Sequence, residues 1–245
     1  RAIIVNSGNA NCFVGERGIK DALRIIQNIG RQLKISKDNI FIASTGIIGK
    51  PLPSVLIKQA LSKLCRNLNK SGLLSFADSI LTTDTFRKVT TVRLKINNKP
   101  VLITGIAKGA GMIYPNLEKN SIHATMLVFI LTDIAVKRQL LELALNEAVN
   151  NSFNGISIDG CMSTNDTVLI LANGAAGNKP IVKKDRNFTL FRSSLLHVCE
   201  NLSRMIVVDA EGGTKLIEIL VKGTKDRKEA KVSAVLFNSF YFLDF

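Results

Sequence analysis

The sequence lacks the patterns that define several large classes of protein. Its four cysteines are far apart and form no CxxC pair: Cys12, Cys65, Cys161 and Cys199. This spacing suggests neither a zinc knuckle nor a small disulfide scaffold. No apolar run reaches the roughly eighteen residues that a membrane-spanning helix needs, and the N-terminal residues lack the layout of a secretory signal. We therefore expect a soluble protein with free thiols in a reducing compartment.

Motifs for nucleotide binding and serine hydrolysis are also missing. The chain contains neither a GxxxxGK[ST] loop nor a GxGxxG turn. No serine lies in a GxSxG context, and the histidines are only His123 and His197, which disfavours a Ser-His-Asp triad. We expect His197 to be a core residue on a helix.

Positive charge is the main anomaly of the composition. The net charge of +14 could indicate nucleic acid or anionic lipid as a partner. The basic residues are scattered, however, with short clusters at 183–184 and 222–231, and aromatic residues make up 6% with no interleaved basic and aromatic pattern. We expect neither a nucleic-acid partner nor a membrane partner.

Apolar patterns alternate between those typical of strands and those typical of helices. Strands are predicted at 2–5, 40–43, 126–131, 167–172 and 216–221, with a hairpin at 91–96 and 101–106. Helices are predicted at 19–33, 55–68, 140–148 with Asp133 as the cap, and 188–204. A hydrophobic content of 46% supports a substantial core. The sum predicts a mixed layered α/β fold.

Residues 104–131 hold the most suggestive chemistry. A glycine-rich turn contains Lys108, and Thr125 follows a small residue and precedes an apolar run. A threonine becomes a good nucleophile when the peptide bond before it is cut, because the new α-amine, which titrates near pH 8, serves as its general base. Taken alone, however, the glycine-rich turn also fits an ordinary loop, and Thr125 also fits an ordinary strand residue.

The wider sequence resembles the bifunctional ornithine acetyltransferase family of arginine biosynthesis, also called glutamate N-acetyltransferase. Motifs such as ILTTDTFRK, GIAKGAGMIYPN and VVDAEGGTK carry the resemblance in order along the chain, within blocks at 5–18, 43–53, 80–88, 105–116, 124–133, 152–174 and 207–215. It implies the α/β fold of that family, whose precursor cuts itself at an Ala-Thr bond. The two pieces stay associated and pair into a heterotetramer.

This resemblance implies a role for each matching residue. The cut falls between Ala124 and Thr125, which makes residues 1–124 and 125–245 two subunit-like segments, truncated at the N-terminal and C-terminal ends respectively. Thr125 is then the nucleophile, Thr45 and Gly46 form the oxyanion hole, and the substrate contacts are Thr82, Lys108, Thr125 and Glu211.

The implied reaction moves an acetyl group from N-acetylornithine to glutamate through an acetyl-threonine intermediate. It needs no metal and no cofactor, although some members also use acetyl-CoA as the acetyl donor. The expected compartment is the cytoplasm, with the mitochondrial matrix as the alternative.

Three departures from the family pattern point to impaired activity. Residues 117–123 are inserted before the nucleophile, and segments that family members have at both ends are missing from this sequence. Two other readings therefore stay open. One is a related N-terminal-nucleophile amidase or aminopeptidase that uses the same Thr125, and the other is a non-catalytic remnant or a basic binding protein.

Overall fold

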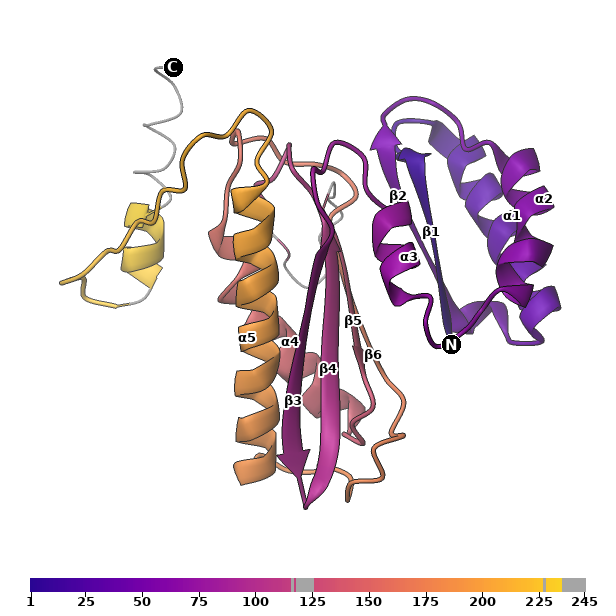
Figure 1. Ribbon diagram of the computed structural model, residues 1–245. Helices are drawn as coiled ribbons and strands as arrows, with labels where there is room; N and C mark the ends of the chain where they lie inside the picture. Colours follow the sequence, from indigo (N-terminus) through magenta and orange to yellow (C-terminus); the bar gives the residue numbers. More distant parts are fainter. Residues whose placement is uncertain (116, 118–125, 227, 235–245) are drawn as a thin grey trace.

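The computed structural model describes residues 1–115, 117, 126–226 and 228–234, and it holds two β-sheets with helices packed on them (Figure 1). The first sheet has two parallel strands, β1 (Ala2–Asn9) and β2 (Ile40–Ile47), paired along their whole lengths. Helix α1 (Gly15–Leu33) connects these strands, and α2 (Ser54–Arg66) packs beside α1. Buried apolar side chains of these elements and their connections form one core: Ile25, Ile29, Ile40, Leu52 and Leu61.

The second sheet has the strand order β3-β4-β5-β6 and carries the larger core. Its strands are β3 (Lys88–Ile96), β4 (Lys99–Lys108), β5 (Leu127–Thr132) and β6 (Thr167–Ala172). The β3–β4 and β4–β5 pairs are antiparallel, and β5 and β6 are parallel. Asn97 and Asn98 form the hairpin turn with φ values of 48° and 61°, the positive φ that two-residue turns of this kind require.

Two long helices pack together beside the second sheet (Figure 1). These are α4 (Arg138–Asn150) and α5 (Arg186–Val208), and α5 contacts β3 and β4. Gly105 on β4 allows the close approach of α5, since a Cβ there would lie 2.6 Å from Leu202 Cδ1 and 2.7 Å from Val198 Cγ1. The sheet and the helix therefore meet through a glycine on one side and branched apolar side chains on the other.

A short helix, α3 (Leu73–Ser79), lies between the two sheets, and single 3₁₀ turns, η1 (Lys37–Asn39) and η2 (Phe153–Gly155), precede β2 and follow α4 (Figure 1). Phe76 on α3 packs edge-on against Phe129 of β5, with ring centroids 5.5 Å apart and ring planes at 72°. Buried side chains from both sheets and from α3 with its C-terminal cap share this boundary: Ala43, Ala77, Ile80, Ile106, Leu127 and Phe129. The mixed layered α/β class predicted from the sequence is confirmed.

Two predicted strand ends are wrong because polar residues do not stop these strands. The polar residues 6–9 continue β1 and residues 44–47 continue β2, since the two strands go on pairing as far as Asn9 beside Ile47. Every residue other than proline has both the backbone N–H and the C=O that pairing uses, so side-chain polarity alone does not end a strand. Thr45 therefore lies within β2.

The sequence also misplaced features of the second half. Asp133 does not cap α4, because the N-cap of that helix is Lys137. The Asp133 carboxylate instead accepts the Leu102 N–H at 2.8 Å. Residues 206–208 continue α5, and residues 216–221 form no strand. The apolar alternation at 216–221 has no neighbouring strand to pair with among the described residues. Helix α3 was not predicted.

His197 is exposed on α5, so its prediction as a core residue is wrong. Its Nε2 lies 3.2 Å from the amide nitrogen of Asn201, one turn further along. The buried face of α5 runs through Leu195, Val198 and Leu202, and His197 falls outside that stripe.

No helix among the described residues is long and apolar enough to cross a membrane.

Candidate active site

Charged side chains from four segments meet at one end of the second sheet. Lys88 begins β3 and Lys108 ends β4, and the register brings them close because Lys88 pairs with Ala107. The loop between α3 and β3 supplies Asp84, and the C-terminal end of α5 supplies Asp209. Each of these four charged side chains is at most 1% exposed. Charges buried to this degree need partners, and the network provides them.

Two threonine hydroxyls hold Lys108. Its Nζ donates to Thr45 Oγ1 at 3.1 Å and to Thr82 Oγ1 at 2.8 Å. Oδ2 of Asp84 lies 3.6 Å from the same nitrogen, which is an electrostatic contact and too long for a hydrogen bond. Because an ammonium has three N–H donors, one remains for a further acceptor. Thr45 belongs to β2, so this ammonium links the two sheets.

Lys88 bridges two carboxylates. Its Nζ lies 2.7 Å from Asp84 Oδ1 and 2.5 Å from Asp209 Oδ2. Asp84 Oδ1 also accepts the Gly109 N–H at 2.6 Å, and Asp209 accepts the N–H of Thr85 at 3.0 Å as well as its hydroxyl. Each carboxylate is therefore held by the Lys88 ammonium and by a main-chain N–H.

Burial and pairing together set the pKa values of this network. Burial by itself raises the pKa of Asp84, but hydrogen bonds from Gly109 and Lys88 and the positive charges of Lys108 and Lys88 lower it overall. The pKa of Asp209 is lowered too, because hydrogen bonds from Lys88 and a neighbouring threonine outweigh the effect of burial. Burial lowers the pKa of Lys108, and the Asp84 carboxylate opposes that shift only in part.

The turn after Lys108 lies against Glu211. The Glu211 N–H donates to the Ala110 carbonyl at 2.7 Å. A Cβ on Gly111 would lie 2.8 Å from the Glu211 carboxyl carbon, so glycine is what allows that carboxylate to rest on the turn. Gly109 has a φ of 146°, a conformation that L side chains rarely adopt. The turn therefore needs its glycines.

Three predicted site residues come together in the structure. Thr45, Thr82 and Lys108 meet through the two hydrogen bonds at the Lys108 ammonium. Gly46 follows in β2 with a φ of 126°, and a Cβ there would lie 2.4 Å from the Gly8 carbonyl carbon, so only glycine fits. The catalytic roles of these residues stay predictions.

The predicted cleavage bond between Ala124 and Thr125 lies outside the described residues, as do residues 118–123 of the predicted insertion at 117–123. Leu127 stands two positions after Thr125 in the sequence and pairs with Lys108 across β5 and β4. The predicted cleavage bond therefore falls, along the sequence, between two strands that are neighbours in the sheet.

The sequence did not predict several residues of this network. Asp84 and Lys88 lie within ILTTDTFRK and Asp209 within VVDAEGGTK, so the available signal was the presence of these charged residues inside the quoted motifs. Asp166 was also missed; its buried carboxylate accepts the N–H of Met126. Lys88 and Asp209 are 121 positions apart, and their pairing follows only from the way α5 packs on β3.

The described part of the chain contains no group of three or more His, Cys, Asp or Glu side chains that could hold a metal ion.

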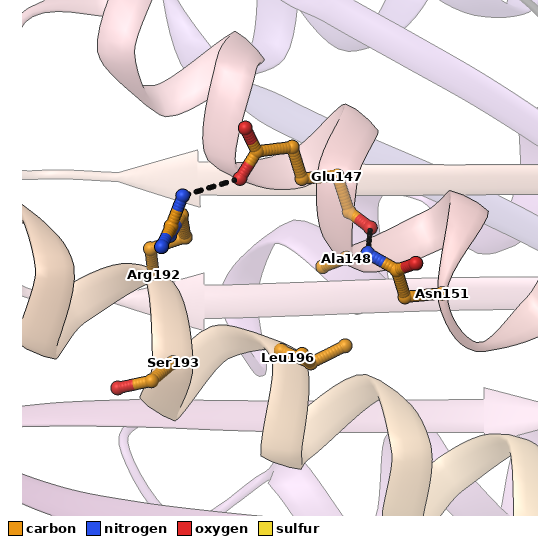
Figure 2. Close-up of a pocket in the computed structure, with 6 residues that line it drawn as sticks. All are labelled: Glu147, Ala148, Asn151, Arg192, Ser193 and Leu196. Carbon is orange, nitrogen blue, oxygen red and sulfur yellow. Dashed lines mark hydrogen bonds and ion pairs between the residues drawn. The ribbon is translucent and has the colours of Figure 1, made fainter. Parts of the chain in front are cut away.

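A separate hollow lies between α4 and α5 (Figure 2). Glu147 and Arg192 form an ion pair across it at 3.2 Å, and Asn151 Nδ2 donates to the Glu147 carbonyl at 2.7 Å. Its remaining lining residues are small or apolar, and none of its lining residues belongs to the Lys108 network. It is a gap between two helix surfaces that an exposed ion pair spans.

By its fold and its site, the chain is a layered α/β protein with a buried lysine and aspartate network at the strand ends. The model of the ArgJ family matches residues 1–239, and the chain belongs to the ArgJ family.

Two relatives illustrate this membership. The arginine biosynthesis bifunctional protein ArgJ of Caldanaerobacter subterraneus subsp. tengcongensis is 42% identical over 234 residues, which cover 96% of this chain and 57% of that protein. The glutamate N-acetyltransferase of Methanocaldococcus jannaschii is 44% identical over 242 residues, which cover 98% of this chain and 58% of that protein. The chain thus spans less than two thirds of the length of these relatives.

Two crystal structures are similar over part of the chain. The arginine biosynthesis bifunctional protein ArgJ of Bacillus halodurans is 38% identical with a TM-score of 0.44, covering 47% of this chain and 61% of that one. An ornithine acetyltransferase of Mycobacterium tuberculosis, crystallised with ornithine, is 26% identical with a TM-score of 0.41, covering 47% of this chain and 62% of that one.

Proposed function

We propose that this chain transfers an acetyl group from N-acetylornithine to glutamate through an acetyl ester on Thr125. Membership of the ArgJ family and the names of the two relatives support this reaction. The observation that carries it in the structure is the convergence of Thr45 and Thr82 on the Lys108 ammonium, because these residues come from three separate motifs.

The charges of the site suit an amino-acid substrate. Lys108 offers an ammonium for the substrate carboxylate, and Glu211 offers a carboxylate for a substrate amine. Thr45 Oγ1 accepts a hydrogen bond from Lys108, so its own O–H is available to donate elsewhere. With the Gly46 N–H it would stabilise the negative charge that develops on the acetyl oxygen.

The proposed reaction has two balanced halves. The α-amine of Thr125 takes the hydroxyl proton as Oγ attacks the acetyl carbonyl of N-acetylornithine, and the C–N bond then breaks as the leaving ornithine amine regains a proton. The amine of glutamate next attacks the ester, which restores the threonine hydroxyl and yields N-acetylglutamate. Acetyl-CoA is a second donor that this scheme accepts.

The sheet supports an association of the two pieces after cleavage. β4 would be the last strand of the first piece and β5 the first strand of the second, and these strands pair from Ile103 beside Thr132 to Lys108 beside Leu127. Cutting the connection leaves that pairing in place. We propose that the two pieces stay together and assemble further into a heterotetramer, in the cytoplasm or alternatively in a mitochondrial matrix.

Intact mass, N-terminal sequencing and an acetyl-transfer assay test this proposal. We expect two pieces, the second beginning at Thr125, and transfer of acetyl from N-acetylornithine to glutamate. Thr125→Ala should abolish both cleavage and transfer. A single uncut chain in fresh and aged samples would favour a non-catalytic remnant, while release of free acetate without transfer would favour the amidase reading.

Substrate binding is tested by Lys108→Met. We expect a KM for N-acetylornithine raised by about tenfold or more, since a hydrogen bond to a charged group contributes roughly 1.5–3 kcal/mol. Lys95→Met on the exposed side of β3 is the matched control and should leave KM unchanged. Equal KM values in the two variants would show that Lys108 does not bind the substrate.

A further inference from the structure

We propose that Lys88 is a positioning residue that fixes Glu211 relative to Lys108. This inference rests on the proposed function for the roles of Lys108 and Glu211, and it adds a residue that is hydrogen-bonded to neither of them. Lys88 acts through two carboxylates, one attached to the glycine-rich turn and the other at the end of α5.

The first connection runs from Lys88 to the glycine-rich turn. Lys88 Nζ holds Asp84 Oδ1 at 2.7 Å, and the same oxygen accepts the Gly109 N–H at 2.6 Å. Gly109 directly follows Lys108, so the backbone beside the Lys108 side chain is anchored to the Lys88 ammonium through a single carboxylate oxygen.

The second connection runs from Lys88 to Glu211. Lys88 Nζ holds Asp209 Oδ2 at 2.5 Å, and Asp209 stands two residues before Glu211. The Glu211 N–H then returns to the glycine-rich turn by donating to Ala110 O at 2.7 Å. The two connections together form a closed ring of contacts, which begins at Lys88 and is completed by the hydrogen bond between Glu211 and Ala110.

Lys88 also governs which groups hold Lys108. Asp84 Oδ1 faces Lys88 and Gly109, while Oδ2 accepts the Thr82 N–H at 3.2 Å and lies 3.6 Å from Lys108 Nζ. The hydrogen bonds of Lys108 go to threonine hydroxyls instead. An ammonium bound to neutral hydroxyls keeps its charge available for an incoming carboxylate, whereas one bound directly to a carboxylate does not.

The test uses the charge-balanced double variant Lys88→Met/Asp209→Asn, because removing one partner alone would leave a buried charge unpaired and could prevent folding. Amide hydrogen exchange is followed by NMR at Glu211 and, as an internal reference, at Ile130 in the middle of β5. We expect the Glu211 amide to exchange about tenfold faster while Ile130 is unchanged, as for the loss of one anchored hydrogen bond.

A matched control removes an exposed ion pair of the same kind. Arg138→Met/Glu142→Gln deletes the 2.8 Å pair on α4 and should leave Glu211 exchange at its wild-type rate. Unchanged exchange at Glu211 in Lys88→Met/Asp209→Asn would overturn the proposal. Equal acceleration at Glu211 and Ile130 would overturn it as well, because it would reduce Lys88 to a general stabilising residue.

Kinetics give the second readout. In Lys88→Met/Asp209→Asn we expect KM for N-acetylornithine to rise about tenfold with kcat changed less than about twofold, which is the signature of weaker binding of the substrate when Glu211 is no longer held relative to Lys108. A wild-type chain without transfer activity would count against the proposed function alone, because the exchange experiment judges the role of Lys88 independently of catalysis.

Discussion

Asp84 and Asp209 release their protons more readily in the folded protein than in the unfolded chain, where the pKa is near 3.8. A carboxyl with a lowered folded pKa contributes stability that is fully present above the unfolded pKa and is lost as pH falls through the folded pKa. We therefore predict that the contribution of these two carboxyls to the free energy of unfolding, measured by urea titration, is steady just above pH 5 and is lost as the pH falls below about 3.8.

Lys88→Met/Asp209→Asn tests that pH dependence. It removes one of the two shifted carboxyls together with its counter-charge, so the fall in stability at low pH should be shallower than in the wild type. Asp38→Asn, at an exposed position in η1, serves as the control and should keep the wild-type slope. Identical slopes in all three proteins would show that the network does not govern acid stability.

Residue by residue, the quoted motifs were informative about which side chains lie together. Thr82 and Lys108 belong to motifs quoted from the chain, and the structure joins them through one ammonium. Lys88 could not be predicted, because nothing in a sequence states that a lysine at the start of a strand will meet an aspartate 121 positions later. Tertiary packing creates that pair.

Among the elements, the contact of α5 with β4 depends on the absence of a Cβ at Gly105. Gly105→Ala adds a Cβ that would lie 2.6 Å from Leu202 and 2.7 Å from Val198, both fully buried. We predict that it lowers the free energy of unfolding by about 1–3 kcal/mol, the usual cost of overpacking a core. Urea unfolding followed by circular dichroism measures the change.

Gly155→Ala is the matched control for the added methyl group. A Cβ at this glycine would meet no atom within 4 Å. Its effect should stay within about 0.5 kcal/mol, as for most substitutions on the surface. Equal stabilities of the two variants would mean that α5 moves away from β4 without cost.

Element types were easier to predict than element ends. The hairpin was found because Asn97 and Asn98 separate two extended runs, and α1 was found from its apolar spacing. The ends of β1 and β2 were placed too early because their last residues are polar. Helix α3 was missed because its seven residues are too few to show a period clearly.

For the molecule as a whole, the joint between the two sheets is polar as well as apolar. The Asn165 amide group donates to the carbonyls of Ala10 and Ser44, the latter at 3.0 Å, and so ties the segment before β6 to the first sheet. We predict that Asn165→Ala lowers the free energy of unfolding by about 1–3 kcal/mol, because both carbonyls lose a partner.

Chemical unfolding of Asn165→Ala beside Asn173→Ala measures this effect. Asn173 is exposed, and its side chain accepts only a local bond from the Ala175 N–H at 2.9 Å. We expect a change of less than about 0.5 kcal/mol for Asn173→Ala. If Asn165→Ala also changes the free energy of unfolding by less than about 0.5 kcal/mol, the Asn165 hydrogen bonds do not stabilise the contact between the two sheets.

The position of Lys88 also bears on how α5 forms. Carbonyl groups at the C-terminal end of a helix carry a partial negative charge, which a nearby cation offsets. No basic side chain lies in the last turn of α5, and Asp209 at its C-cap adds a further negative charge. The ammonium of Lys88 supplies the missing cation from β3. The final turn of α5 therefore receives its counter-ion only after the hairpin has docked, which couples the ordering of the helix end to the folding of the sheet.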